Sequence, residues 1–540
     1  MPGPDPVSSS LDPLRRNHRE DSESKQFRHV GAIDIGTNST HLLVAEIDPV
    51  LHTFSIKLAE KSTTRLGERD FESGELTDSA MNRVFDALKG FKELAESYKV
   101  EELLIAATSA VREAPNGEEF LQKVRSELGL DIDLISGAEE ARLIYLGVLS
   151  GMPFGDNPHI LIDIGGGSTE LILADARDAR ALTSTRVGAV RLQRDFIRED
   201  PLSVKRREFL RTFIEGSLEP AVNKISSRIK ENEYPTIVAT SGTAMAIGSL
   251  IASEESTASV SLHGFTISEE QLDKSVEKLL SLNLDQRKKL APLNERRAEI
   301  IVPGALILQK TIKMFSAKEL ILSERALREG LIFDWMLRKG LLKDQFGFQS
   351  SIRKRTIYHQ ANRFAVNISR AEYVADNALI IYEKTKGILH NDRGLGKELL
   401  WAAAMLHTCG QHINLSGYHK HSWYLIRHGE LLGYSHSEHL MVAAIARYHR
   451  RSLPKKRHDS WQSLIKGNQR RIVYEMSILL RLAASLDRRP NPAVNTIDVI
   501  KQEDNLIFKL AAISENQNLN LERWSLLNNV ELLKDNFDLS

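Results

Sequence analysis

Between about Val30 and Arg328, short apolar runs rich in β-branched residues alternate with longer stretches whose apolar residues recur every three or four positions. The longer stretches predict helices over 78–98 and 117–128. The short runs predict strands. They are HLLVAEI, TFSIKLAEK, ELLIAATSA, DIDLISG, HILIDIG, TELILAD, TSTRVGAVRL, TIVATSG and ELILSE. Strands that alternate with helices predict α/β domains with mixed or parallel sheets.

After about Gly340 the spacing of apolar residues becomes almost entirely helical. The final segment, from TIDVIKQEDNLIFKLAA onward, returns to a strand pair followed by a terminal helix. We therefore expect a mostly helical domain and then a small α+β segment.

Two stretches of the α/β region have nearly the same sequence, AIDIGTNSTHLLVA from Ala32 and LIDIGGGSTELILA from Leu161. Glycines let a ligand approach the main chain closely, and successive N–H groups in such a turn bind anions. A single copy is as well explained by a structural β-turn. Two copies predict two similar domains around a cleft, whose turns hold successive phosphates of one ligand.

These patterns divide the chain into five predicted parts. They are a tail at 1–28, α/β domains at 29–150 and 151–330, a helical domain at 340–495 and an α+β segment at 496–540. The tail is expected to be disordered, because proline, serine and charged residues dominate it. It lacks the apolar core of a signal peptide.

Composition narrows the class of protein. The chain has 540 residues, of which 42% are hydrophobic and 27% charged, and Lys plus Arg equals Asp plus Glu at 72 each. This balance gives no sign of a nucleic-acid partner. No apolar run approaches the ~20 residues that span a bilayer, so no stable membrane insertion is expected. The single cysteine, Cys409, excludes an intramolecular disulfide and fits a reducing cytoplasm, which is the expected location.

The repeat resembles the paired phosphate loops of the actin, sugar kinase and heat-shock chaperone superfamily. With AATSAVREAPNG, LISGAEEARLIYLGV, ATSGTAMA and LSERALREGLI, the chain is similar to the exopolyphosphatase / guanosine pentaphosphate phosphatase family in its long form. The resemblance implies two ribonuclease H-like (actin-like ATPase) domains around a cleft, followed by a domain resembling the HD phosphohydrolase fold. It also implies hydrolysis of a terminal phosphoanhydride, a Mg²⁺ cofactor and a homodimer.

The resemblance assigns Glu140, in SGAEEARL, as the base that activates water. Without the resemblance, Glu139 and Glu140 would be interpreted as acids that stabilise the start of a helix through the helix dipole. Asp163 and Glu170 flank the second turn and are predicted to serve the metal, because Mg²⁺ prefers carboxylate and phosphate oxygens. His41 stands where Glu170 would be in the first turn, which places the metal at the second turn.

The remaining site residues are predicted to bind phosphate. Arg112 suits this role through its forked guanidinium, and Arg65 lies in another family motif, TTRLGE. Ser241, Gly242 and Thr243 form a third small-residue turn, for which a plain helix cap is an equal alternative. The full phosphate-binding set is Asp34, Gly36, Thr37, Asn38, Ser39, Arg65, Arg112, Gly165, Gly166, Gly167, Ser168, Ser241, Gly242 and Thr243.

In the helical domain, an HD hydrolase would hold metal with histidines and aspartates. The candidates are His359, His407 and Asp487, but Thr408 stands where the aspartate paired with His407 should be. The domain is therefore predicted to be a degenerate relative without a working metal site.

A basic cluster in ARYHRRSLPKKRH is predicted either to guide a long polyanion or to be a solvated surface. It comprises Arg447, Arg450, Arg451, Lys455, Lys456 and Arg457, followed by Lys466, Arg470 and Arg471.

Four functions can be weighed against these residues, and the last two fit them less well. The first is an exopolyphosphatase that removes terminal phosphate from inorganic polyphosphate. The second is a guanosine pentaphosphate 5′-phosphatase, which the sequence hardly separates from the first. A superfamily kinase would need an acceptor pocket with its own Asp base. A non-catalytic sensor of phosphate chains would gain nothing from the acids Glu140, Asp163 and Glu170. The basic cluster favours polyphosphate.

Overall fold

The computed structural model describes residues 27–70, 72–155, 157–255, 261–342, 352–392, 394–464, 466–503, 505–514 and 516–537. The chain forms two compact units, residues 1–351 and 352–540. Most of the predicted disordered tail lies outside the described residues, and the first strand begins at Arg28. No helix among the described residues is long and apolar enough to cross a bilayer.

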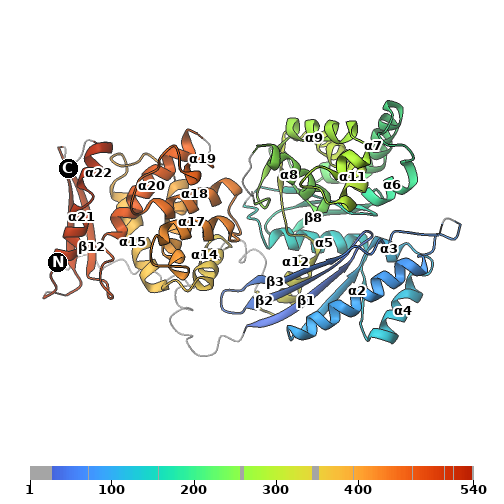
Figure 1. Ribbon diagram of the computed structural model, residues 1–540, viewed down its shortest axis with the longest axis horizontal. Coiled ribbons are helices and arrows are strands. Elements are labelled where there is room, and N and C mark those ends of the chain that lie inside the picture. Colours follow the sequence, from blue (N-terminus) through green and yellow to red (C-terminus); the bar gives the residue numbers. More distant parts are fainter. Residues whose placement is uncertain are drawn as a thin grey trace. The chain divides into compact units, whose positions relative to one another are not determined.

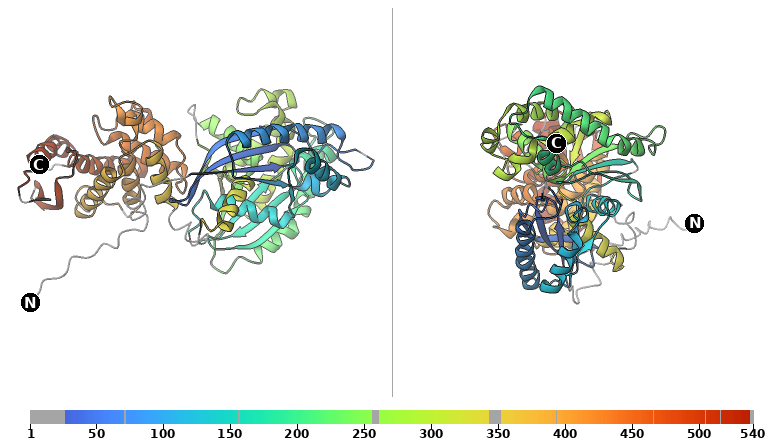
Figure 2. Two further views of the ribbon diagram at one scale, coloured as in Figure 1. Left: turned by 90° about the horizontal axis from the view of Figure 1, so that it is seen from below. Right: turned by 90° about the vertical axis from the view of Figure 1, so that its right-hand side faces the viewer.

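The first unit begins with a five-stranded mixed sheet of order β3-β2-β1-β4-β5 (Figure 1). β1 pairs antiparallel with β2 and parallel with β4. The strands are β1 (Arg28–Ile35), β2 (Thr40–Asp48), β3 (Thr53–Ser62), β4 (Glu102–Ala107) and β5 (Asp133–Leu134). The long helix α2 (Asp78–Ser97) lies along one face of this sheet (Figure 2), and α4 (Gly117–Leu128) joins the same core. We refer to this part as lobe I.

Lobe II is built on a six-stranded mixed sheet of order β10-β11-β9-β6-β7-β8. Its strands are β6 (His159–Ile164), β7 (Thr169–Ala174), β8 (Ala179–Thr185), β9 (Thr236–Thr240), β10 (Thr266–Ser268) and β11 (Glu319–Leu322). Its larger helices are α7 (Val204–Ser226), α8 (Ser241–Glu255), α9 (Glu269–Ser281) and α11 (Glu295–Met314), and a shorter one is α10 (Leu284–Lys288). They supply the buried apolar side chains that cover the sheet.

Two helices connect the lobes. α5 (Gly137–Leu149) follows the lobe I sheet in sequence but packs on β7 and β8, whereas α12 (Leu327–Arg338) packs on β1 and β2. The two helices also pack on each other between the sheets (Figure 1). A Cβ at Gly147 would lie 1.8 Å from the Ala326 carbonyl oxygen, and one at Gly330 equally close to that of Leu143. Glycine is therefore required at this crossing.

The predicted helices over 78–98 and 117–128 are confirmed as α2 and α4. The predicted strand TSTRVGAVRL is wrong over its second half, because β8 ends at Thr185 and α6 (Ala189–Phe196) follows. The backbone N–H groups at the start of α6 donate to carbonyl oxygens of the second glycine turn. That contact is made between segments distant in sequence, and the local pattern does not contain it.

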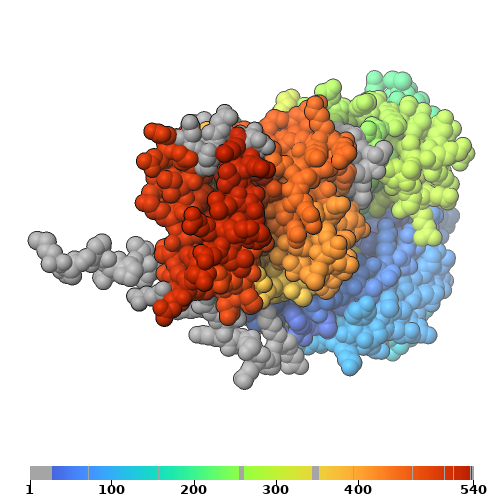
Figure 3. All heavy atoms as spheres, turned by 60° about the vertical axis from the view of Figure 1, so that its left-hand side comes forward, coloured from blue at the N-terminus to red at the C-terminus, as the bar shows by residue number. Residues whose placement is uncertain are grey.

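The second unit is mostly helical and ends in a β-hairpin with two short helices; Figure 3 shows its surface in orange and red. The helices are α14 (Ile352–Arg363), α15 (Ile368–Lys384), α16 (Leu395–Leu406), the 3₁₀ helix η1 (Cys409–His412), α17 (Tyr418–His428), α18 (His436–Tyr448), α19 (Asp459–Gln462) and α20 (Asn468–Ala484). The hairpin is β12 (Val494–Gln502) with β13 (Asn505–Ala512), followed by α21 (Asn520–Leu527) and α22 (Val530–Phe537).

Candidate active site

The two repeated turns have the same backbone construction. Loop 1 (residues 36–39) joins β1 to β2, and loop 2 (residues 165–168) joins β6 to β7. In each loop the first glycine N–H donates to the carbonyl of the last serine, at 3.1 Å in loop 1 and 2.9 Å in loop 2. Asp34 lies opposite His41 in the strand register, and Asp163 lies opposite Glu170. Side chains directly opposite on antiparallel strands share a face of the sheet.

The carbonyl groups of both loops are held from behind. The Thr37 and Asn38 carbonyls accept from the N–H groups of Gly67 and Arg65, at 2.8 and 3.0 Å. In loop 2, the Gly165 and Gly166 carbonyls accept from the first N–H groups of α6. The C=O and N–H of one peptide plane point in opposite directions. The loop N–H groups therefore turn away from these anchors.

Those N–H groups are available to a ligand. Within the described residues, the backbone N–H groups of Asn38, Ser39, Gly166, Gly167 and Ser168 donate to no protein acceptor. A concave row of such donors is a typical anion site. The two loops thus provide two phosphate cradles.

The loops also pack directly on each other. A Cβ at Gly166 would lie 2.8 Å from Thr37 Cβ, and one at Gly167 would lie 2.4 Å from Ser109 Oγ. Ser109 belongs to α3 (Ser109–Arg112), and its hydroxyl is 3.1 Å from that of Thr37. The triple glycine of loop 2 is therefore required by the approach of loop 1, in addition to any ligand.

A cavity of about 300 Å³ lies in front of the loops, and most of the predicted site residues line it. The predicted residues in its wall are Asp34, Gly36, Thr37, Asn38, Ser39, Glu140, Asp163, Gly165, Gly166, Ser168, Ser241, Gly242 and Thr243. Glu140 reaches it from α5, and the 241–243 turn reaches it from the start of α8.

Four predicted residues lie outside this wall. Gly167 lines a small cavity of about 20 Å³ behind the loops. Arg65 lines a neighbouring cavity of about 390 Å³, where its Nη2 is 2.9 Å from Glu299 Oε2. Glu170 is 1% exposed and accepts from the Ser184 hydroxyl at 2.8 Å. The fourth is Arg112.

Arg112 contacts the predicted base. Its Nη2 lies 3.2 Å from Glu140 Oε2, and its Nη1 donates to the Ile135 carbonyl at 2.6 Å. A guanidinium held in this way orients Glu140 and stabilises its charged form. The predicted contact between Arg112 and phosphate stays a prediction.

The acids of the site are buried together. Burial, followed by Glu140 and Asp34, raises the pKa of Asp163 to about 7. Burial and then Asp163 raise the pKa of Glu170 to about 8, and burial raises that of Asp34 to about 6. Burial and the neighbouring Glu170 also raise the pKa of Glu140 well above its ordinary value. Such an assembly favours a bound cation, because a cation lowers the free energy of the ionised acids.

The residues present fit a magnesium ion. Asp34 Oδ1 is buried and has no hydrogen-bond partner in the described part of the chain. No group of three or more His, Cys, Asp or Glu side chains is arranged to hold a metal among the described residues. Mg²⁺ does not need such a group, since it is commonly held by one or two carboxylates, waters and substrate phosphates.

Sequence reasoning missed three cations in the cavity wall, namely Lys61, Arg297 and Arg328. Lys61 lies opposite His41 in the register of β2 and β3. Burial, with Arg328, Lys61 and Arg297, lowers the pKa of His41 to about 3, so the imidazole is neutral at pH 7. Of the three, Arg328 could have been predicted, because it lies in the family motif LSERALREGLI.

The third turn shows strain and an open polar atom. Ser241 has a φ of 92°, which is unusual for a residue with a Cβ. Thr243 Oγ1 is buried without a hydrogen-bond partner among the described residues. A Cβ at Gly242 would lie 2.1 Å from a guanidinium nitrogen of Arg297. Strain of this kind is concentrated at functional sites.

The second unit contains a cavity of about 1010 Å³ lined by five arginines and one carboxylate. The carboxylate, Asp487, is held in a fork by Arg370, with contacts of 2.9 and 3.2 Å. His407 lines the same cavity, and its Nδ1 contacts the Ala404 carbonyl at 2.6 Å. His359 is not in the wall. Asp487, one of the three candidate metal ligands, is therefore paired with the Arg370 guanidinium.

The basic cluster meets this cavity at Arg450 and Arg451. The Arg450 guanidinium lies 4.6 Å from the centre of the Tyr418 ring. Lys455, Lys456 and Arg457 are exposed on the surface. Arg447 is partly buried, and Lys466, Arg470 and Arg471 follow in and before α20. The five arginines of the cavity are Arg370, Arg450, Arg451, Arg481 and Arg488.

Comparisons with known proteins agree with this arrangement. Residues 43–339 match the model of the Ppx/GppA phosphatase family, and residues 352–534 match its domain III. A guanosine-5′-triphosphate,3′-diphosphate pyrophosphatase of Vibrio parahaemolyticus is 30% identical over 89% of this chain and 91% of its own length. A crystal structure of an exopolyphosphatase from Cytophaga hutchinsonii is 26% identical, with a TM-score of 0.53 over 59% of this chain and all of its own. An Aquifex aeolicus Ppx/GppA structure is 30% identical, with a TM-score of 0.50 over 58% of this chain and 99% of its own.

Proposed function

Because the chain belongs to the Ppx/GppA phosphatase family, as the sequence predicted, we propose that it is a Mg²⁺-dependent exopolyphosphatase. It would release terminal orthophosphate from inorganic polyphosphate. One observation carries the proposal: two outward-facing rows of N–H groups, a buried carboxylate and three cations meet in a single cavity. Linear phosphate chains need such repeated donors, and phosphoanhydride hydrolysis needs a group that orients water.

In this mechanism, loops 1 and 2 bind successive phosphates through their N–H groups, and Lys61, Arg297 and Arg328 neutralise charge on the chain. Glu140, held by Arg112, accepts a proton from the attacking water. Asp163, with Glu170 behind it and Asp34 across the cavity, would hold Mg²⁺. When bound, the ion would supply charge neutralisation at the phosphate oxygens.

A second candidate is hydrolysis of the 5′-triphosphate end of guanosine pentaphosphate. It is favoured by the relatives that match along most of their length, since those from Vibrio parahaemolyticus and Vibrio vulnificus are both named as pyrophosphatases of that compound. Both candidate reactions cleave a terminal phosphoanhydride. The same loops and the same base serve either substrate.

The test is phosphate release from long-chain polyphosphate and from guanosine pentaphosphate, each with Mg²⁺ and with EDTA. We expect release that requires Mg²⁺, and a loss of about 10²- to 10⁴-fold in Glu140→Gln. Equal rates in wild type and variant would refute the base. Release from guanosine pentaphosphate alone would make the second candidate the function.

We further propose that the basic cluster guides long chains and that the helical domain is an HD-like relative without a working metal site. The arginine-lined cavity at Arg450 and Arg451 and the pairing of Asp487 with Arg370 support this. Neutralising Arg450, Arg451, Lys455 and Lys456 together should raise KM for long chains more than for tripolyphosphate. An effect independent of chain length would count against the cluster.

A further inference from the structure

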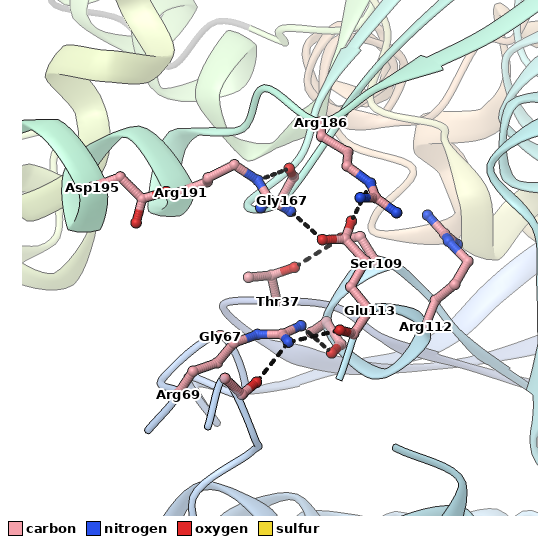
Figure 4. Close-up of polar contacts among 12 residues, drawn as sticks. Thr37, Gly67, Arg69, Ser109, Arg112, Glu113, Gly167, Arg186, Arg191 and Asp195 are labelled. Atoms are coloured by element: carbon pink, nitrogen blue, oxygen red, sulfur yellow. Dashed lines mark hydrogen bonds and ion pairs between the residues drawn. The ribbon is translucent and has the colours of Figure 1, made fainter. Parts of the chain in front are cut away.

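The short helix α3 and the residue that follows it contact loop 1, the predicted base and lobe II. Ser109 contacts Thr37 of loop 1, and Arg112 contacts Glu140. The next residue, Glu113, faces lobe II, where its carboxylate accepts from Arg191 Nη2 at 2.7 Å. Figure 4 shows the Glu113 carboxylate meeting Arg191 and the more distant Arg186, with the Arg112 side chain beside it.

Arg191 belongs to α6 of lobe II and makes two contacts with one guanidinium. Its Nε donates to the Gly167 carbonyl of loop 2 at 2.9 Å, while Nη2 donates to Glu113 (Figure 4). The Glu113 side chain is 10% exposed and that of Arg191 23%. Charged hydrogen bonds shielded to this extent are stronger than those between fully exposed groups.

We propose that Arg191 and Glu113 form a clasp between the lobes that orients loop 2 and α3 for catalysis. The inference rests on the proposed function, because turnover is its main readout. Arg191 and Glu113 act as positioning residues in this scheme, since neither lines the substrate cavity.

The clasp acts on loop 2 through a peptide plane. Gly167 and Arg191 both line the small cavity behind the loops, whereas Ser168 lines the substrate cavity in front. The Gly167 carbonyl is held at the back, so the N–H of Ser168 in the same peptide points to the front. Loss of the guanidinium frees this peptide to rotate, and one phosphate donor is then misdirected.

The clasp acts on the base through α3. Arg69 holds this helix from within lobe I by donating to the Ala110 carbonyl at 2.7 Å and the Glu113 carbonyl at 3.0 Å. The Glu113 carboxylate fixes the same helix end to lobe II. Without that second attachment, α3 and Arg112 can tilt away from Glu140, and a displacement of about 1 Å can cost about 100-fold in rate.

The experiment is a double-mutant cycle with Arg191→Gln, Glu113→Gln and the double variant, using the better of long-chain polyphosphate and guanosine pentaphosphate. We expect each single change to lower kcat about 10- to 100-fold with KM altered less than about threefold. The double variant should be no slower than the slower single variant, because both remove one clasp. Arg191→Lys should recover only part of the rate, since an ammonium lacks the fork that bridges both acceptors.

The matched control is Arg211→Gln, which removes another arginine–glutamate pair of lobe II, 2.6 Å from Glu277. Neither residue lines a cavity at the loops. It should leave kcat unchanged. The clasp would be refuted if the losses of kcat in the two single variants multiplied in the double variant. It would also be refuted by a rise in KM alone, or by an equal loss of kcat in the control. A wild type that releases phosphate from neither substrate would instead refute the proposed function. Melting temperatures close to wild type show that the variants are folded.

Discussion

The two glycine loops share a backbone but present opposite chemistry. Beside loop 1, adjacent strands place Asp34, His41 and Lys61 in one cross-strand row. The buried imidazole is neutral at pH 7, and the lysine joins Arg297 and Arg328 in the wall of the cavity. Apart from Asp34, whose carboxyl would help to hold Mg²⁺, this side of the cavity favours an anion.

The corresponding row beside loop 2 consists of Asp163, Glu170 and Ser184. It has two buried carboxyls and a hydroxyl that donates to one of them. This side favours a cation. The comparison indicates that one hairpin can be specialised through its neighbouring strands, while its phosphate-binding backbone stays the same.

The largest difference is expected between Glu170 and His41. Glu170→Gln should lower kcat about 100-fold and raise the Mg²⁺ concentration needed for half-maximal activity, because it changes the row that supports the metal. His41→Gln should lower kcat less than about tenfold, since the imidazole is uncharged. Phosphate release measured across Mg²⁺ concentrations checks both. Equal losses of kcat in the two variants, with an unchanged Mg²⁺ requirement in Glu170→Gln, would contradict the prediction that Glu170 supports the metal and His41 does not.

The next largest difference concerns the glycines. Gly167→Ala should lower kcat by about tenfold or more, because its Cβ would meet Ser109 of α3 and Thr37 of loop 1 and separate the loops. Gly36→Ala meets only the Ser39 carbonyl of its own loop within 3.5 Å, at 3.0 Å, and should cost less. The kcat values of the two variants test which loss is larger. Melting temperatures close to that of the wild type would show that both variants are folded. A greater loss in Gly36→Ala would contradict the expected order.

Glu170 and His41, at matching places in the two rows, should also respond to pH in opposite directions when Mg²⁺ is absent. Burial raises the pKa of Glu170 from 4.5 to about 8, so the folded state binds this proton more tightly and loses stability as pH rises across that range. Burial lowers the pKa of His41 from 6.5 to about 3, so the folded state gains stability as pH rises from 3 to 6.5.

Melting temperatures in EDTA test this prediction. Relative to wild type, Glu170→Gln should gain stability between pH 5 and pH 8. Relative to wild type, His41→Gln should gain stability as pH falls from 7 to 5. Parallel profiles for the two variants would show that Glu170 and His41 are not shifted in opposite directions.

The smallest effect is expected at the edge of loop 1. Arg65→Gln removes the ion pair with Glu299 between the lobes, in which the side chains are 43% and 37% exposed. Such pairs contribute about 0–1 kcal/mol. Urea unfolding should show a loss within that range, and kcat should change less than about threefold. A large rise in KM would instead support the predicted contact of Arg65 with phosphate.

Much of the site was predictable because the residues of each glycine hairpin lie close together in the sequence. Strand alternation, the strand-end aspartates and the glycine turns are set within about fifteen residues of each other. Their equivalence also predicted that Glu170 and His41 occupy matching places, which the registers confirm. The strand over 183–192 was wrong for the opposite reason, since α6 is held by loop 2 and not by its own pattern.

The sequence by itself determined the family, the two hairpins and the acids beside their turns, because turns and strand periodicity depend on neighbouring residues. Only the tertiary structure decided that Lys61, Arg297 and Arg328 converge on the loops and that Arg112 contacts Glu140. It also decided that Glu113 meets Arg191. These contacts join segments far apart in the chain. The two helices that join the lobes also meet only in the tertiary structure, and their close crossing requires glycine.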